Sequence, residues 1–212
     1  MKPVLRALLS FAALGTCCFA QKWEFGGVGG GGFISNVNVT APSGSATAGF
    51  QPGLAAGAFL SENLYSHLSG EIRYEYRQND LYLQSGGTKV TFSGNAHMLH
   101  YDLLYHTNRK GARAQAFVAA GAGLKIFRGT GAPQAFQPLY QFGFLTRTQQ
   151  LKPMASVGAG LRFNITNRVF MRVEVRDFIS PFPQNVIAAP SGVKYGSILN
   201  DIVPMAGISY MF

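Results

Sequence analysis

Charged residues are scarce in this chain, and so are cysteines and long apolar runs. Asp, Glu, Lys and Arg make up 13% of its 212 residues, against roughly 25% in a typical soluble domain. A chain with so little charge has little water-facing surface to cover. After Ala20, no apolar run reaches the ~20 residues that a membrane-spanning helix needs. If the chain lies in a membrane, it must therefore span it as a closed β-barrel, because an open sheet edge would leave backbone groups unpaired in lipid.

Only two cysteines occur, Cys17 and Cys18, and both lie in a segment with the features of a secretory signal peptide. The segment has a positive start at Lys2 and Arg6, an apolar core, and small residues at the predicted cleavage site. We therefore expect residues 1–20 to be a signal peptide cleaved before Gln21, and residues 21–212 to form one domain without disulfides. Two alternatives stay open for this segment, an uncleaved membrane anchor and a lipoprotein signal ending at Cys17.

The chain is basic, with a net charge of +9 and a pI of about 9.8. Lys2 and Arg6 contribute two of these charges, so removal of the signal peptide would leave +7. A basic balance is typical of nucleic-acid-binding proteins, but most of the basic residues here are interleaved with acids. Only Arg109, Lys110 and Arg113 form a patch. We expect no nucleic-acid partner for an exported chain.

Two segments alternate between apolar and charged residues. In residues 68–77 one parity is Leu68, Gly70, Ile72, Tyr74 and Tyr76, and the other is Ser69, Glu71, Arg73, Glu75 and Arg77. Residues 169–176 repeat the pattern. Because side chains alternate across a strand, both segments are predicted to be strands with one apolar and one charged face. A soluble sheet would bury the apolar face, whereas a membrane barrel would turn it to lipid and fill its interior with the charges.

Eight strands are predicted in all, and the connections between them alternate in length. The strands cover about residues 22–35, 49–61, 66–78, 90–106, 114–128, 154–163, 168–179 and 202–212. Connections 62–64, 107–113 and 164–167 are short, whereas 36–48, 79–89, 129–152 and 180–201 are long and rich in small and polar residues. Such alternation is typical of an outer-membrane barrel with periplasmic turns, extracellular loops and periplasmic termini. We therefore predict an all-β fold, an eight-stranded antiparallel up-and-down transmembrane β-barrel.

The fourth predicted strand changes parity along its length. Phe92, Gly94 and Ala96 lie on the opposite parity from Leu99 and Tyr101. This change predicts a β-bulge near residues 97–98. Alternatively, the segment before residues 97–98 lies above the membrane, where the alternation need not hold.

Aromatic and small residues favour the orientation with lipid outside. Rings are predicted on the apolar parity at both membrane interfaces, with Trp23, Phe25, Tyr105, Tyr210 and Phe212 at the short-turn end and Phe33, Phe50, Tyr74 and Tyr76 at the loop end. The polar parity contains small residues such as Gly158 and Gly160, which suit the narrow interior of an eight-stranded barrel.

Charges on the polar parity nearly balance, with five acids against six bases. They are Glu24, Glu71, Glu75, Asp102 and Glu174, and Arg73, Arg77, Lys125, Arg162, Arg172 and Arg176. Buried charges have to be paired, and the fork of arginine pairs well with a carboxylate. Our hypothesis is an ion-paired network that fills the barrel interior rather than an ion-conducting pore.

The last predicted strand resembles the terminal strand signal of bacterial outer-membrane proteins. Ala206, Ile208, Tyr210 and Phe212 alternate, and phenylalanine is the C-terminal residue. With the leader and the strand pattern, residues 21–212 resemble small eight-stranded barrels of the OmpA/OmpX type. The resemblance implies an outer-membrane location, contact with outer-membrane lipid, and recognition of Tyr210 and Phe212 by the barrel-assembly machinery. The chain ends at the last strand, so no peptidoglycan-binding domain is implied.

Two groups of polar residues contain the residue types of barrel enzymes. His67, Ser69 and Glu71 compare with the His/Ser pair and acid of lipid A hydrolases, and a second group compares with Asp/His outer-membrane proteases, namely His100, Asp102 and His106. Both groups are predicted in the periplasmic half of the barrel interior, away from outer-leaflet or extracellular substrates. Apart from the pair His97 and His100, the histidines are not at ligand spacing on one surface, so no three-residue metal site is predicted. We therefore expect no catalytic residues, no metal and no cofactor.

The sequence thus predicts a non-enzymatic outer-membrane barrel that contributes to envelope integrity or surface interaction. Three alternatives stay open: a narrow channel, a lipid-modifying or proteolytic barrel enzyme, and a secreted soluble barrel of lipocalin type with its faces reversed. Aromatic residues on the loops could bind a partner or could pack against one another. The loop ligand stays unknown.

Overall fold

The computed structural model describes residues 23–107, 112–134 and 136–212, so the predicted signal peptide and the pair Arg109 and Lys110 lie outside the described residues. Eight long strands close into an antiparallel barrel. They are β1 (Trp23–Ile34), β4 (Gly53–Asn63), β5 (Leu68–Gln78), β8 (Gly94–His106), β9 (Ala114–Gly129), β11 (Gln149–Asn164), β12 (Val169–Pro181) and β15 (Ile198–Met211). Each pairs with the next long strand along the chain, and β1 pairs with both β4 and β15. The predicted eight-stranded up-and-down barrel is therefore confirmed.

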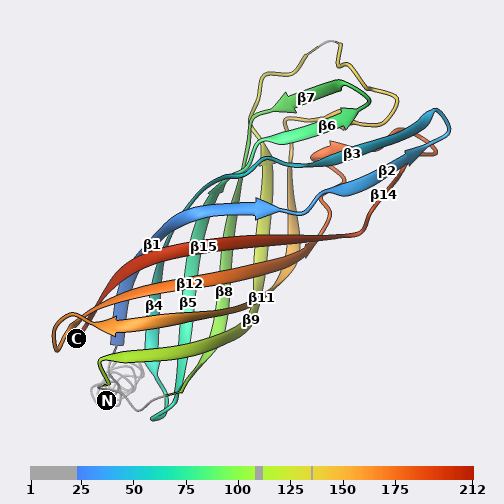
Figure 1. Cartoon of the computed structure of the whole chain (residues 1–212). Coiled ribbons are helices and arrows are strands. Elements are labelled where there is room, and N and C mark those ends of the chain that lie inside the picture. Colours follow the sequence, from blue (N-terminus) through green and yellow to red (C-terminus); the bar gives the residue numbers. More distant parts are fainter. Residues whose placement is uncertain (1–22, 108–111, 135) are drawn as a thin grey trace, which may run out of the picture.

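Alternation along the strands decides which side chains enter the barrel. On β5, Glu71, Arg73 and Glu75 are fully buried, whereas Ile72 and Tyr74 between them are 47% and 46% exposed. The tilted strands form a closed wall, and both the first described residue and the C-terminus lie at the end with the short turns (Figure 1). That arrangement places the charged parity in the lumen and the apolar parity on the outer surface. Within the described residues there is no helix with the length and hydropathy to cross a membrane.

Several predicted strand boundaries were wrong, and the β-bulge is absent. β8 pairs with β5 in unbroken register from Asn95 through Tyr105, so no extra residue interrupts the strand near residues 97–98. Phe92 belongs instead to a separate strand outside the barrel. Gly94 and Ala96 are buried because they lie on the inward parity of β8. β11 begins five residues earlier than expected, at Gln149, because its upper part continues to pair with β9 beyond Pro153.

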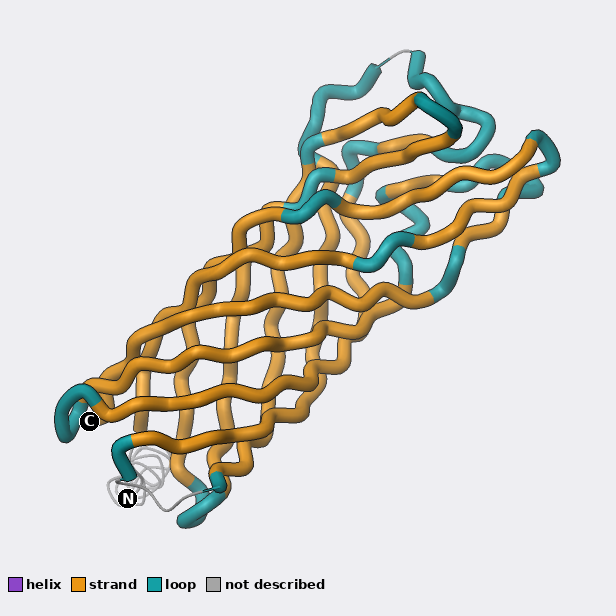
Figure 2. Tube along the Cα trace, in the orientation of Figure 1, coloured by secondary structure: helices purple, strands orange, loops and turns teal. Residues whose placement is uncertain are grey.

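The long loops contain regular structure that the sequence reading treated as irregular. Five short strands form a second sheet at the loop end, beyond the barrel wall in Figure 2 and labelled in Figure 1. In order across the sheet they are β14-β2-β3-β6-β7. Their bounds are β2 (Val37–Ala41), β3 (Gly44–Phe50), β6 (Leu81–Ser85), β7 (Thr88–Phe92) and β14 (Lys194–Tyr195), and a separate pair is formed by β10 (Phe144–Leu145) and β13 (Ile187–Ala188). We call the five-stranded unit the loop sheet.

The loop sheet and the neighbouring loops share a hydrophobic core with the upper barrel. Val39, Leu81 and Phe182 are buried in this core, together with Phe127 from the barrel strand β9. Phe50, predicted to face lipid, is 2% exposed and stacks on Phe127 with ring centroids 5.3 Å apart. The prediction for Phe50 was wrong because β3 ends there and directs the ring into the core. The loops are thus a packed cap on the barrel.

The loop aromatic residues differ in burial. Phe142 is buried in the cap, and the Tyr195 hydroxyl donates a hydrogen bond to the Phe142 carbonyl oxygen at 3.0 Å. Burial raises the pKa of Tyr195 to about 12. Phe136 and Tyr140 remain exposed and lie beside each other, with ring centroids 6.1 Å apart.

Candidate functional site

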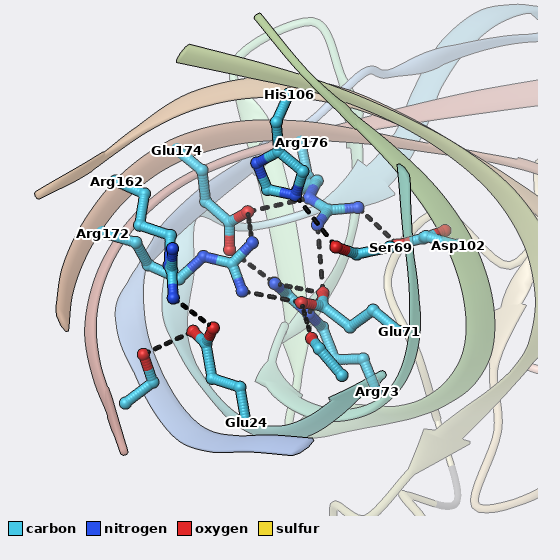
Figure 3. Close-up of polar contacts among 12 residues, drawn as sticks. Glu24, Ser69, Glu71, Arg73, Asp102, His106, Arg162, Arg172, Glu174 and Arg176 are labelled. Atoms are coloured by element: carbon cyan, nitrogen blue, oxygen red, sulfur yellow. Dashed lines mark hydrogen bonds and ion pairs between the residues drawn. The ribbon is translucent and has the colours of Figure 1, made fainter. Parts of the chain in front are cut away.

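The centre of the lumen contains a network of arginines and carboxylates from strands on opposite sides of the barrel. Arg73 contacts Glu71 at 2.7 Å and Glu75 at 3.0 Å on its own strand, β5, and Glu174 on β12 at 2.6 Å. Arg172 in turn contacts Glu71 at 2.7 Å. Figure 3 shows Arg73, Arg172 and the carboxylates of Glu71 and Glu174 converging in the barrel interior. The network therefore crosslinks β5 and β12, which do not pair with each other.

Arg176 extends this network to a third strand. It contacts Glu174 at 3.0 Å and Glu71 at 3.2 Å, and it also pairs with Asp102 on β8. The nitrogen Nδ1 of His100 lies 3.1 Å from the Asp102 carboxylate. His100 and Asp102 are thus a neighbouring pair inside the ionic network, and His106 lies at the short-turn end of the same strand.

A second ion pair lies nearer the short-turn end. Arg162 on β11 contacts Glu24 on β1 at 2.6 Å and donates a hydrogen bond to the Gln115 side chain at 2.9 Å. Ser209 on β15 donates a hydrogen bond to the other oxygen of Glu24 at 2.6 Å. The guanidinium carbon of Arg162 also lies 3.5 Å from the centroid of the Phe170 ring. This ion pair joins β11 to β1, which do not pair with each other, and the hydrogen bond from Ser209 adds β15.

Near the loop end, a third cluster depends on Asp201, which the sequence analysis missed. Arg77 contacts Asp201 at 2.9 Å, and Lys125 contacts it at 2.7 Å. The predicted last strand began at residue 202, which left Asp201 in a loop. The observed strand starts at Ile198, so Asp201 lies on its inward parity, two residues before the buried Val203. Because side chains alternate with a period of two, counting back two residues from Val203 would have assigned Asp201 to the inward face of the strand.

All eleven charged residues predicted for the interior are placed in the lumen. Nine have ion-pair partners among one another, and the other two, Arg77 and Lys125, pair with Asp201. With Asp201 included, the acids number six and match the six bases. A fully paired set is what burial of charge requires, because an unpaired buried ion costs several kcal/mol.

Apolar side chains fill much of the remaining interior. Phe59, Met98, Met154, Phe178 and Met205 belong to one buried cluster inside the barrel. The guanidinium of Arg172 lies over the Phe59 ring at 4.4 Å. Inward glycines make space for the large groups: a Cβ at Gly158 would overlap the Arg176 side chain. At the short-turn mouth, the cavity beside Ser69 and His106 measures only about 10 Å³, room for about one water molecule.

The three residues compared with the lipid A hydrolases, His67, Ser69 and Glu71, do not form a His/Ser/acid site. His67 directs its Nδ1 at the backbone oxygen of His106, 2.9 Å away, and its ring stacks beside Tyr105. Ser69 instead lies 3.2 Å from Nε2 of His106, and Glu71 accepts a hydrogen bond from Ser61 at 2.9 Å. The structure therefore places Ser69 beside His106 rather than beside His67. Residues 67 and 106 lie next to each other at the short-turn end of the paired strands β5 and β8.

The two residues predicted to form the C-terminal assembly signal, Tyr210 and Phe212, lie on the outer surface of β15 and just beyond its end. Tyr210 is 44% exposed and Phe212 is 65% exposed. The Tyr210 hydroxyl accepts a hydrogen bond from Arg168 at 3.2 Å, and the backbone of Phe212 pairs with that of Trp23. Both rings are therefore available to lipid or to another protein at the short-turn end.

Comparisons with known proteins agree with this architecture. A comparison with curated proteins found no match. Among solved structures, the chain is similar to Neisserial surface protein A, with 11% identity over 90% of this chain and 97% of that one and a TM-score of 0.53. It is also similar to the outer membrane protein AlkL, whose structure was determined by solid-state NMR in DMPC bilayers, with 13% identity over 90% of each chain and a TM-score of 0.54. At these identities the likeness shows the fold alone.

Residues 7–196 match the family described as the outer membrane protein beta-barrel domain. This match covers most of the chain and agrees with the closed eight-stranded barrel, its apolar outer face and its ion-paired lumen. The chain belongs to the outer membrane protein beta-barrel domain family and is located in the outer membrane.

Proposed function

We propose that this protein is a non-catalytic structural barrel of the outer membrane, with a closed lumen and an ordered extracellular cap that serves surface interaction. The observation that carries the proposal is the filling of the lumen by paired charges and an apolar cluster. A permeating ion would have to separate buried ion pairs, which costs several kcal/mol for each pair broken. The packed cap supports the same conclusion at the loop end.

The absence of a catalytic role rests on the surroundings of Ser69 and His106. Their neighbours at the short-turn mouth include Arg162 and Arg172, and the adjoining cavity has room for about one water molecule. A hydrolase needs space for a substrate carbonyl within reach of the nucleophile. We infer that these side chains stabilise the mouth of the barrel.

The proposed partners follow from the exposed surfaces. The apolar outer wall is the contact for outer-membrane lipid, and the exposed rings of Tyr210 and Phe212 are the surface offered to the barrel-assembly machinery. A cellular partner would meet the outer face of the loop sheet, which is polar and largely uncharged, with Asn38, Thr40 and Gln84 lining a groove.

Conductance across a planar lipid bilayer tests the closed lumen. Purified protein inserted singly should give no discrete current steps, while a general porin in the same bilayer gives steps that scale with salt concentration. Heat-modifiable migration on a detergent gel verifies that the inserted protein is folded. Reproducible steps from the folded protein would contradict the proposal and favour the narrow-channel alternative.

A further inference from the structure

The buried charges of the lumen balance, so the basic excess of the described residues lies on side chains outside this buried set, including Lys152, which is half-buried on the inward parity of β11. Six interior acids balance six interior bases once Asp201 is counted. Among the exterior bases, Arg128 is distinctive because it lies on the outward parity of a barrel strand, β9. Its neighbours on that parity, Ile126 and Leu124, are apolar and exposed. The sequence analysis assigned no role to this arginine.

Polar side chains occupy one register row across three neighbouring strands at the level of Arg128. Arg128 pairs with Asn95 on β8 and with Gln149 on β11. In the next outward row toward the short turns, Ile126 pairs with His97 and Leu151. On β9 and β11 the outward side chains therefore change from apolar to polar at the row of Arg128, which marks the upper edge of the lipid-facing surface in this part of the wall.

The length of the apolar stretch on β9 agrees with that boundary. A strand tilted by about 40° rises roughly 2.5 Å per residue along the barrel axis. The outward parity runs from Ala116 to Ile126, and these ten steps span about 25 Å, the height of the apolar band of an outer-membrane barrel. Arg128, the next outward residue, is therefore at the level of the outer-leaflet headgroups.

Arg128 shares a cleft with a second exposed arginine. The cleft measures about 270 Å³ and is lined by Arg128, Gly129, Thr130, Arg147, Thr148 and Gln149. Its lining contains two guanidinium groups and two threonine hydroxyls but no carboxylate. Among the described residues, neither Arg128 nor Arg147 forms an ion pair, in contrast to the six paired bases of the lumen. The cleft therefore presents uncompensated positive charge beside lipid.

Hydrogen bonds hold the backbone around the cleft in place. The backbone N–H of Gly129 donates to the Thr148 carbonyl at 2.9 Å, which joins the end of β9 to the segment before β11. The Thr148 hydroxyl donates to the Asn185 carbonyl at 2.8 Å. A binding surface whose backbone is already ordered loses less conformational entropy on binding.

We propose that Arg128 and Arg147 bind the phosphate group of an outer-leaflet lipid headgroup. A guanidinium donates two parallel hydrogen bonds to phosphate oxygens, and the Thr130 hydroxyl is a further donor in the lining of the cleft. We assign the phosphate to a lipid rather than to a free ion because the cleft adjoins the apolar wall of the barrel. Acyl chains packed on Ile126 and Leu151 would place the headgroup phosphate beside the cleft. This site would fix the height of the barrel in the membrane.

Native mass spectrometry of the folded protein in detergent, titrated with phosphatidic acid, tests the proposal. The double variant Arg128→Gln, Arg147→Gln should bind phosphatidic acid about tenfold more weakly than the unmodified protein, because it loses two charged contacts at an exposed site. The matched control is Lys194→Gln, which removes a positive charge from the loop sheet, and it should bind as the unmodified protein does. Heat-modifiable migration verifies that each variant is folded.

Two further arms distinguish the lipid from a free anion. Phosphatidylcholine, whose headgroup has no net charge, should bind equally to the unmodified protein and the double variant. Inorganic phosphate at the concentration of the lipid should not displace phosphatidic acid, because it lacks acyl chains. Equal binding of phosphatidic acid to the double variant, or its displacement by inorganic phosphate, would overturn the proposal.

Discussion

Arg73 shows how a single residue connects distant parts of the barrel. Its guanidinium contacts three carboxylates, those of Glu71, Glu75 and Glu174, all within 3.0 Å. No water-facing surface is available to solvate these groups if the arginine is removed, because all four side chains are fully buried. The stability of the lumen is therefore sensitive to individual charges.

We expect Arg73→Leu to lower the free energy of unfolding by about 3–5 kcal/mol, because it leaves buried carboxylates short of a cation. The change is measured by urea unfolding of the protein in detergent, with the loss of heat-modifiable migration as the readout. Arg113→Leu, which removes an exposed arginine near a short turn, is the control and should leave the midpoint unchanged. Equal midpoints for the two variants would show that Arg73 is hydrated rather than buried.

Strand parity was sufficient to predict which side of the wall most charged residues occupy. Parity is a local property, and it depends only on the chain being extended. The missed residue, Asp201, required knowledge of where β15 begins, and strand ends are set by pairing with β12 across the barrel. Pairing also decides that Ser69 meets His106 rather than His67, since the two strands must be aligned before cross-strand neighbours are known.

Among the elements, the loop strands show where the sequence reading failed. Val37, Val39 and Ala41 alternate in β2, as do Leu81 and Leu83 in β6, but each run is only five residues long. Runs of that length are too short to distinguish a strand from an irregular loop. Their pairing partners lie far apart in the chain, as with β14 and β2. Only the shared core makes these strands stable together.

The pKa of Tyr195 provides a test of the packed cap. Burial raises it to about 12, from an ordinary value of 10.0. The unfolded chain therefore loses this proton before the folded chain does, and the stability of the folded state falls as pH rises from 10 to 12. The difference between tyrosinate absorbance titrations of the unmodified protein and Tyr195→Phe should show one group titrating near 12. A difference titrating near 10 would indicate that the cap is open to water.

The last strand offers a test that separates assembly from stability. Phe212 is largely exposed, so Phe212→Ser should leave the unfolding midpoint of the refolded protein unchanged within the small range expected for surface substitutions. We expect the same variant to reduce the amount of folded barrel in outer-membrane fractions of expressing cells. The matched control Phe136→Ser changes an exposed loop ring. Normal assembly of Phe212→Ser would contradict a role for this residue as a signal.

For the whole molecule, one arrangement explains the composition. The lumen contains most of the acidic residues, the wall presents apolar side chains to lipid, and the cap covers the loop end with its own core. Because the lumen is filled and the wall faces hydrocarbon, little of the surface faces water, and few charged residues are needed to cover it. Fold and location were therefore predictable from alternation and loop lengths, whereas the cap, which depends on contacts between distant loops, was not.

Adjacent positions 156 and 157 on β11 allow the most direct measurement of this arrangement. Ser156 is fully buried in the lumen, and Val157 on the opposite face is 43% exposed. Each is replaced singly by cysteine, in a chain whose two native cysteines lie at positions 17 and 18, and the mature folded Ser156→Cys protein is treated in bilayers with a fluorescent maleimide. The thiol of Val157→Cys lies in hydrocarbon, where no thiolate forms, so it is instead labelled in the unfolded protein before refolding into bilayers, and brominated lipids should quench its fluorophore. The thiol of Ser156→Cys should react only after heat unfolding. Free reaction of the thiol of Ser156→Cys with a water-soluble maleimide in the folded state, or an unquenched label at position 157, would contradict the account.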